Sequence, residues 1–421
     1  MLPIRRVTAA ATLTLAALVL AACGTDTTTT SSASPSPPSA SAAQGFDQVL
    51  QEAKGQTVNW YMYGGDDRLN AYVNGYVKDQ LATLGITLNQ VKINDTAEAV
   101  NKVLGEKQAG KDSGGSVDLI WINGENFATL KQADALRCGY VEQLPSTDNV
   151  DLTKPGIATD FGTPTEGCEV PWQQATSALV YDSTALQKKD TVSVQALFDW
   201  AKAHPGRFTY PAPPDFTGSM AVRTFFFDTA GGAEQFLGPF DEQKFDAAAP
   251  ALYTRLNALE PSLWRGGNTY PAGQPQVEKL FAGGEIDAYL TYGSSAIAGL
   301  VEKGTLPKTT RSAVFDKGNI GNYSFTAIPY NAAHPAAAQV LANLLLSPRA
   351  ALVNAGPDGA GFTSAIDLAK LPAEQRAEFV ALQSSPYQVP PEKLAAKTLP
   401  EVSSSYVDAL EKGWKREVLQ K

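Results

Sequence analysis

Apolar residues recur along the chain with two periods, one typical of strands and the other of helices. Residues 57–63 and 86–93 alternate and are rich in aromatic and β-branched side chains, which predicts two strands. Between them, apolar residues at helical spacing predict a helix over 69–81. A helix over 96–107 and an apolar strand over 117–122 follow. This alternation predicts βαβ units and a largely parallel sheet.

The second half of the chain shows the same alternation without repeating the sequence. The patterns predict strands at 177–181, 208–211, 286–291 and 322–329. They predict helices at 194–203, 219–229, 241–259, 274–282, 295–301, 335–346, 373–383 and 403–419. The patterned region has about 375 residues, enough for one large or two medium domains.

The N-terminus has the features of an export signal. Arg5 and Arg6 precede an apolar run over 7–22, which ends in small residues directly before Cys23. This run is shorter than the roughly 20 apolar residues of a membrane span and is typical of a signal peptide. Small residues before a cysteine form a lipobox, in which the thiol is diacylated. We expect a signal peptide over 1–22 and an extracytoplasmic protein anchored to the cell membrane by lipid on Cys23; an ordinary signal with a coincidental cysteine is the alternative.

The segment that follows is expected to be a spacer. Residues 23–45 are nearly all Thr, Ser, Pro and Ala after the cysteine, and they cannot bury enough apolar surface to fold. Prolines among small residues favour an extended chain. We therefore expect a disordered linker over 23–45 that holds the folded part away from the bilayer.

The balance of charges narrows the class of partner. The chain carries 43 acidic and 34 basic residues, evenly mixed, which argues against a nucleic-acid partner.

Besides Cys23 the chain contains Cys138 and Cys168. Two thiols in an oxidising compartment usually pair, and this disulfide would contribute roughly 3 kcal/mol by closing a loop of about 30 residues. Two buried free thiols are the alternative.

Motifs for catalysis, metal or cofactor binding are weak. The two histidines, His204 and His334, each precede a proline and lack the spacing of metal ligands. Residues 105–112 approach a phosphate-binding loop, but Asp112 replaces the hydroxyl residue that binds Mg²⁺. No G-x-S-x-G nucleophile motif occurs, and no carboxylate pair is singled out by its spacing. We predict no enzyme activity, no metal and no cofactor.

Aromatic, glycine and amide residues gather where predicted strands end. Residues 60–66 and 121–127 each close a strand, and ligands of open α/β sheets bind beyond such strand ends. Asp66 and Asn126 fit equally well as helix N-caps, and the two roles can coexist. Further aromatic and proline clusters occupy 171–173, 210–216, 263–267 and 289–293.

Several of these segments resemble a known family. The likeness is carried by residues 114–127, 165–167 with Pro171-Trp172, 204–216, and 320–322 with 328–332. On these segments the chain resembles the type II solute-binding proteins of ABC importers, the maltose- and polyamine-binding kind (extracellular solute-binding family 1). It is most similar to a branch often labelled thiamine-like.

The resemblance implies a two-lobe α/β fold. Each lobe would be a mixed, mostly parallel sheet flanked by helices, with a ligand cleft between the lobes. The first lobe would comprise 46–176 plus 325–362, and the second 177–324 plus 363–421. Such a protein, working as a monomer, closes around a small solute and delivers it to ABC permease subunits and their ATPase. The mechanism would be binding, without catalysis.

We place the ligand contacts in that cleft. From the first lobe they are Tyr63, Gly64, Gly65, Asp66, Asn123, Glu125 and Asn126, with Trp172 near the crossover. From the second lobe they are Asp215, Phe216, Trp264, Tyr292 and Asn322. Replacing Trp172 or Glu125 is expected to weaken binding without unfolding the protein.

These residue types suit an organic cation, because aromatic faces contribute about 0.5–2 kcal/mol of cation–π attraction and carboxylates neutralise charge. Thiamine or a similar aromatic cation, a polyamine and a sugar remain alternatives. Ferric ion is disfavoured because the chain has no adjacent tyrosines. A secreted lipoprotein hydrolase acting on a carbohydrate or ester is the alternative from a different class.

Overall fold

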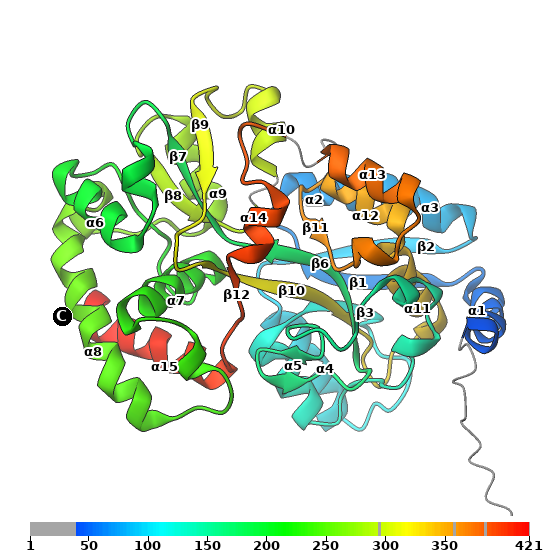
Figure 1. Ribbon diagram of the computed structural model, residues 1–421. Coiled ribbons are helices and arrows are strands. Elements are labelled where there is room, and N and C mark those ends of the chain that lie inside the picture. Colours follow the sequence, from blue (N-terminus) through cyan, green and yellow to red (C-terminus); the bar gives the residue numbers. More distant parts are fainter. Residues whose placement is uncertain (1–38, 294–295, 357–358, 383–384, 421) are drawn as a thin grey trace, which may run out of the picture. The chain divides into compact units, whose positions relative to one another are not determined.

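The computed structural model describes residues 39–293, 296–356, 359–382 and 385–420 (Figure 1). The expected signal peptide and lipidated Cys23 lie outside the described residues. Helix α1 (Ser39–Ala53) begins inside the segment expected to be a linker. Its Ser, Ala and Gln residues are compatible with a helix, and Phe46 and Ala53 of the same helix are buried.

A large mixed sheet forms the centre of the first lobe. Its strand order is β11-β6-β10-β3-β1-β2, with β2, β1 and β3 parallel and β10 antiparallel to both β3 and β6. The strands are β1 (Thr57–Tyr63), β2 (Thr87–Ile93), β3 (Leu119–Ile122), β6 (Glu169–Thr176), β10 (Asn319–Ala327) and β11 (Thr363–Ser364). The predicted βαβ units and parallel strands are confirmed here.

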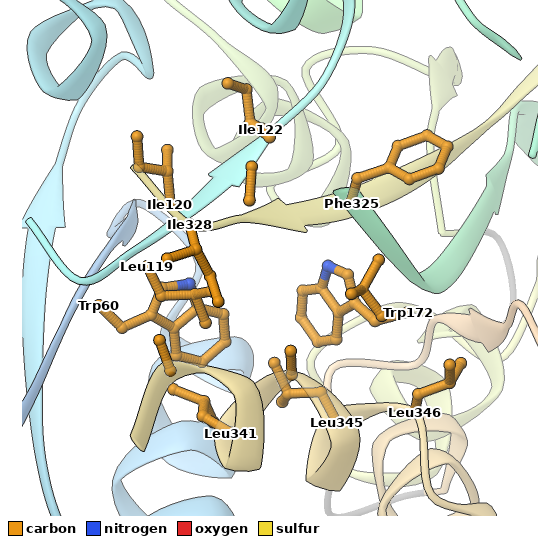
Figure 2. Close-up of a cluster of buried hydrophobic side chains, with 14 of the residues drawn as sticks. Trp60, Leu119, Ile120, Ile122, Trp172, Phe325, Ile328, Leu341, Leu345 and Leu346 are labelled. Carbon is orange, nitrogen blue, oxygen red and sulfur yellow. The ribbon is translucent and has the colours of Figure 1, made fainter. Parts of the chain in front are cut away.

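Helices pack against this sheet and bury its apolar side chains. They are α2 (Asp67–Tyr72), continued by a π-helical turn (Val73–Val77) into α3 (Lys78–Thr83), then α4 (Ala97–Gln108), α5 (Gly124–Gln132), α11 (Pro335–Leu345), α12 (Pro348–Ala355) and α13 (Ala373–Leu382). Figure 2 shows Trp60 and Trp172 in this core beside Leu341 and Leu345 of α11. Among the described residues no single helix is long and apolar enough to cross a membrane; the bent pair α11 and α12 passes that test only jointly.

The second lobe contains a smaller sheet of β8 (Ala288–Thr291), β7 (Ala178–Asp182) and β9 (Thr310–Ala313). Both neighbours of β7 are antiparallel to it, which differs from the mostly parallel sheet that was expected. β7 continues β6 and lies between β8 and β9, and it runs in the direction opposite to both of them. The predicted strand 208–211 forms only one bridge, Phe208 with Ala288, because the prolines around it lack backbone donors.

The helices of the second lobe surround this sheet and enclose separate apolar clusters. They are α6 (Val194–Ala203), α7 (Phe216–Ala230), α8 (Glu242–Leu259), α9 (Gln274–Ala282), α10 (Ala296–Glu302), α14 (Pro391–Ala396) and α15 (Ser404–Trp414), which continues as a π-helical turn (Lys415–Leu419). Short 3₁₀ helices occupy Val141–Gln143, Pro145–Asn149, Lys188–Thr191, Glu234–Phe236, Glu260–Ser262, Trp264–Gly267 and Leu368–Lys370.

The chain crosses between the lobes at adjacent strands. β6 ends at Thr176 and β7 begins at Ala178, close to the expected crossover. β10 lies beside β6, and β12 (Thr398–Leu399) pairs with β10 (Figure 1). β11 still pairs with β6, and Phe379 belongs to the first-lobe core, so the chain stays with the first lobe beyond the expected boundary at residue 362.

The expected disulfide is present. Cys138 and Cys168 are bonded, with their Cα atoms 4.0 Å apart. The bond ties the segment that follows α5 to the residue preceding β6, both in the first lobe. The alternative of two free thiols is thereby removed.

Candidate functional site

The end of β1 places the first group of predicted site residues. Tyr63 turns its hydroxyl beneath Gly65, where a Cβ atom would lie 2.1 Å from the Tyr63 oxygen, so a side chain at position 65 would collide with it. Asp66 accepts hydrogen bonds from the backbone N–H groups of Arg68 (2.8 Å) and Leu69 (3.2 Å) and is the N-cap of α2. The N-cap interpretation of Asp66 is therefore correct.

Carboxylates from both lobes surround Tyr63. The Arg68 guanidinium pairs with Asp66 at 3.0 Å and with Glu278 of α9, in the second lobe, at 3.8 Å. Burial, followed by the charges of Asp215, Asp66 and Glu278, raises the pKa of the Tyr63 hydroxyl. This first charged group thus joins the end of β1 to the second lobe.

Asp215 is the N-cap of α7 and, like Asp66, acts on the Tyr63 hydroxyl through its charge. Its carboxylate accepts hydrogen bonds from the N–H groups of Thr217 (3.0 Å) and Gly218 (2.9 Å). Burial raises the pKa of Asp215, and these two hydrogen bonds oppose the rise. Because burial disfavours the charged form of Asp215, a cation placed beside it would be stabilising.

A second charged group centres on Glu401. Arg223 of α7, 1% exposed, donates to the Glu401 carboxylate at 2.9 and 3.1 Å. Tyr292 donates its hydroxyl to Glu401 at 3.0 Å, and Asn322 donates its side-chain amide at 3.3 Å. Burial lowers the pKa of Arg223, but the charge of Glu401, the hydrogen bonds to it and the nearby Tyr292 and Glu411 together outweigh burial and raise the pKa overall.

Glu125 faces this second group from the first lobe. It lies in the first turn of α5, and its side chain is solvent-exposed. Enough protein nevertheless surrounds the carboxylate for desolvation to raise the pKa of Glu125, while Arg223 lowers it and Glu401 raises it further. The Asn126 amide donates to Glu125 at 3.5 Å. Asn123, not Asn126, occupies the N-cap position of α5, and its side chain makes no capping bond.

A stacked aromatic pair, of which one ring is exposed, adjoins the Glu401 group. The rings of Phe216 and Tyr292 stack with centroids 5.1 Å apart and planes 29° apart. Phe216 is 45% exposed, whereas most large apolar side chains of the described residues are buried. Because Phe216 follows Asp215 directly, the start of α7 connects the two charged groups.

Two predicted contacts lie in apolar cores and not in these groups. Trp172 is 2% exposed and packs edge-to-face against Trp60 and Trp121, with centroids 5.7 and 5.6 Å apart. Trp264 is 7% exposed, donates to Glu285 at 3.2 Å and lies under Arg265. Both positions support a packing role, so neither residue enters the function proposed below.

Sequence reasoning missed Arg68, Arg223, Glu278 and Glu401. Arg223 offered a usable signal, since a lone charge inside the apolar run of α7 requires a buried partner. Glu401 offered none, because its partner lies 178 residues away. Among the described residues, no group of three or more His, Cys, Asp or Glu side chains could hold a metal ion.

A family model and a curated relative each match most of the chain. Residues 72–374 match the family model described as bacterial extracellular solute-binding protein. The chain is 37% identical to protein YnjB of Escherichia coli (strain K12) over 381 residues, which is 89% of this chain and 94% of YnjB.

Solved structures share the fold at low identity. A putative spermidine/putrescine ABC transporter protein from Listeria monocytogenes has a TM-score of 0.61 and 14% identity, covering 85% of this chain and 98% of that one. A periplasmic thiamin binding protein has a TM-score of 0.58 and 18% identity, covering 86% and 96%. The two-lobe α/β fold class is thereby confirmed.

Proposed function

The chain belongs to the bacterial extracellular solute-binding proteins, and from that premise we propose that it captures an organic cation between its lobes for an ABC importer. The proposal includes a lipid anchor at Cys23, which would keep the protein beside the importer's permease and ATPase subunits. It also includes action as a monomer. The binding residues proposed are Tyr63, Gly64, Gly65, Asp66, Asn123, Glu125 and Asn126 of the first lobe and Asp215, Phe216, Tyr292 and Asn322 of the second.

The observation that carries the proposal is the meeting of carboxylates from both lobes beside the exposed Phe216 ring and its stacking partner Tyr292. Glu125 approaches the Glu401 group closely enough for the two charges to interact. Desolvation by the surrounding protein raises the pKa of Glu125, and burial raises the pKa of Asp215, so both carboxylates cost free energy when charged. A cation at this place would offset that cost and could stack on the exposed Phe216 ring.

Capture by this arrangement would depend on closure of the lobes. A solute that contacts Glu125 from one side and Phe216 from the other makes its full set of contacts only when the lobes are together. Such a solute favours the closed state by that difference in contact energy. The named solutes of two similar structures, spermidine/putrescine and thiamin, are organic cations, which is consistent with this chemistry.

Native mass spectrometry of freshly purified protein would identify a retained solute, and titration calorimetry would measure its affinity alongside thiamine and spermidine. We expect Glu125→Gln to weaken binding of the cation about tenfold, because it removes one charge interaction of roughly 1.4 kcal/mol. Glu142→Gln is the matched control, since Glu142 is an exposed first-lobe carboxylate outside both charged groups. Tight binding of a neutral sugar with no cation bound, or equal affinities for the two variants, would contradict the proposal.

A further inference from the structure

A β-hairpin with a two-residue turn lies in the first lobe. Strands β4 (Thr159–Asp160) and β5 (Thr163–Pro164) are antiparallel, and Phe161 and Gly162 form the turn with φ angles of 42° and 79°. We call residues 159–164 the tip hairpin. Positive φ at both turn residues is the geometry that favours Asn-Gly in tight hairpins. A phenylalanine in the left-handed region is unfavourable, so something outside the turn must hold it there.

The tip hairpin is anchored to the first lobe. Asp160 accepts the backbone N–H of Gly124, at the start of α5, at 2.6 Å. Beyond β5, the N–H of Thr165 donates to the carbonyl of Ala158 at 3.0 Å, and Lys131 of α5 pairs with Glu166 at 2.7 Å. These bonds hold the base of the hairpin on the same helix that carries Glu125.

The tip itself lies in the second lobe. Phe161 is 5% exposed and belongs to the apolar cluster that contains the buried residues of α7, α8 and α15. Its ring centroid is 5.8 Å from the guanidinium carbon of Arg223. A Cβ atom on Gly162 would lie 3.4 Å from Cβ of Ser403, the residue that precedes α15. Both turn residues therefore contact the lobe opposite to their own.

The same ring also borders the proposed binding site. A Cβ atom on Gly124 would lie 3.5 Å from the Phe161 ring, so the ring packs directly against the start of α5, one residue before Glu125. The ring is also near Arg223, which donates to Glu401. Phe161 is thus close both to the backbone that positions Glu125 and to the cation that positions Glu401.

We propose that Phe161 is a positioning residue that fastens the two lobes in the closed state. Burial of its ring in the second lobe favours closure, and it brings Glu125 and Glu401 into register for the solute. If the lobes opened, the Phe161 ring would be exposed to solvent, and the strained turn would lose the packing that offsets its strain. The inference rests on the proposed function only in that closure serves capture; the contact between lobes stands without it.

The turn geometry supplies a discriminating variant. Phe161→Asn would create Asn-Gly, the sequence that this turn prefers, while it removes the apolar ring. If Phe161 acted only within the hairpin, this change would be harmless. A fastening role predicts instead that the closed-to-open ratio falls about ten- to a hundredfold, the equivalent of exposing one buried phenylalanine.

The test measures the distance between lobes without any added solute. Spin labels on Lys102→Cys and Lys415→Cys, exposed positions of the first and second lobe, would report that distance by pulsed electron resonance. We expect one dominant distance in the labelled parent, and added populations at other distances in Phe161→Asn. Phe161→Gly, which also tolerates the turn, should behave likewise, and it replaces the Asn variant if that variant fails to fold. Phe161→Leu should be intermediate.

The control variant is Phe240→Asn, which removes a partly exposed ring that packs on Phe245 and Tyr406 within the second lobe. It should leave the distance distribution unchanged. Unchanged distributions in both Phe161→Asn and Phe161→Gly would overturn the inference, whatever solute the protein binds. The proposed function is tested separately: it would be contradicted if no cation were retained and neither thiamine nor spermidine bound. The distances between the lobes would decide the role of Phe161 in either case.

Discussion

Burial of single polar residues sets the electrostatic character of the first lobe near the proposed site. Asp160 and Glu169 are both about 2% exposed, and burial raises the pKa of each carboxyl group well above its ordinary value. Asp160 is compensated by the N–H of Gly124. Among the described residues, neither oxygen of Glu169 has a hydrogen-bond partner. The chain therefore retains a destabilising carboxyl group at Glu169.

Glu169→Gln is expected to stabilise the protein at neutral pH. A raised folded-state pKa means that the folded state holds its proton more tightly than the unfolded state. The wild type therefore loses stability as pH rises from the unfolded value of about 4.3 toward the folded pKa, and the neutral glutamine avoids that loss. Urea unfolding of both proteins at several pH values would measure the difference, which should shrink toward zero at acidic pH. A stabilisation that is independent of pH would contradict this cause.

Trp172→Ala is expected to lower the free energy of unfolding by about 3–5 kcal/mol, because it leaves a cavity between Trp60 and Trp121. This differs from the sequence-based expectation that the variant would stay folded, because Trp172 is buried in the core. Urea denaturation measures the change, and Trp172→Phe should lose less. A stability loss under 1 kcal/mol together with weaker solute binding would return Trp172 to the site.

Helix N-termini carry much of the proposed site. Asp66 caps α2, Asp215 caps α7, and Glu125 lies in the first turn of α5. Carboxylates are stabilised there by the free N–H groups and the helix dipole. The same N–H groups hold each carboxylate in a fixed position. Capping and ligand contact are thus compatible roles for one side chain.

The two roles of Asp215 can be separated by substitution. Asp215→Ala removes both cap and charge and should cost about 1 kcal/mol of stability. Asp215→Asn keeps a capping oxygen, so its stability should stay near the wild-type value while its affinity for a cation falls. Thermal unfolding and calorimetry on both variants give the two readouts. Equal affinity in the wild type and Asp215→Asn would remove Asp215 from the site.

In the whole molecule, adjacent strands couple two separately packed lobes. β6 and β10 lie side by side, and each continues toward the small sheet, β6 into β7 and β10 from β9 (Figure 1). Arg68–Glu278 and the Phe161 contact join the lobes away from these strands. We expect the paired strands to act as the hinge when the lobes separate.

Loss of the disulfide should destabilise the first lobe without changing the affinity for the solute. The Cys138–Cys168 bond spans 30 residues, and replacing both cysteines by serine should cost roughly 3 kcal/mol through greater freedom of the unfolded chain. Urea unfolding of the double variant, compared with the reduced wild type, tests this. A normal solute affinity is expected at temperatures where the variant remains folded, and a lost affinity there would place the bond in the site.

The sequence alone determined the elements whose side chains follow a regular period. Val58, Trp60 and Met62 alternate inward on β1, and the helix spacing of 241–259 gave α8 almost to the residue, since these patterns are local. It also placed Asp66, Asp215 and Phe216 at element ends. Strand β6 was missed because it is buried on nearly every residue and shows no alternation.

Only the tertiary structure decided which of these residues meet. Trp172 reads like a ligand contact in the sequence, but its strand lies over α11 and turns the ring into the core. Glu401 finds Arg223, and Phe161 reaches the second lobe, through contacts between segments far apart along the chain. Local periodicity fixes which face of an element is apolar; the partner of each face depends on how distant elements pack, which no local pattern encodes.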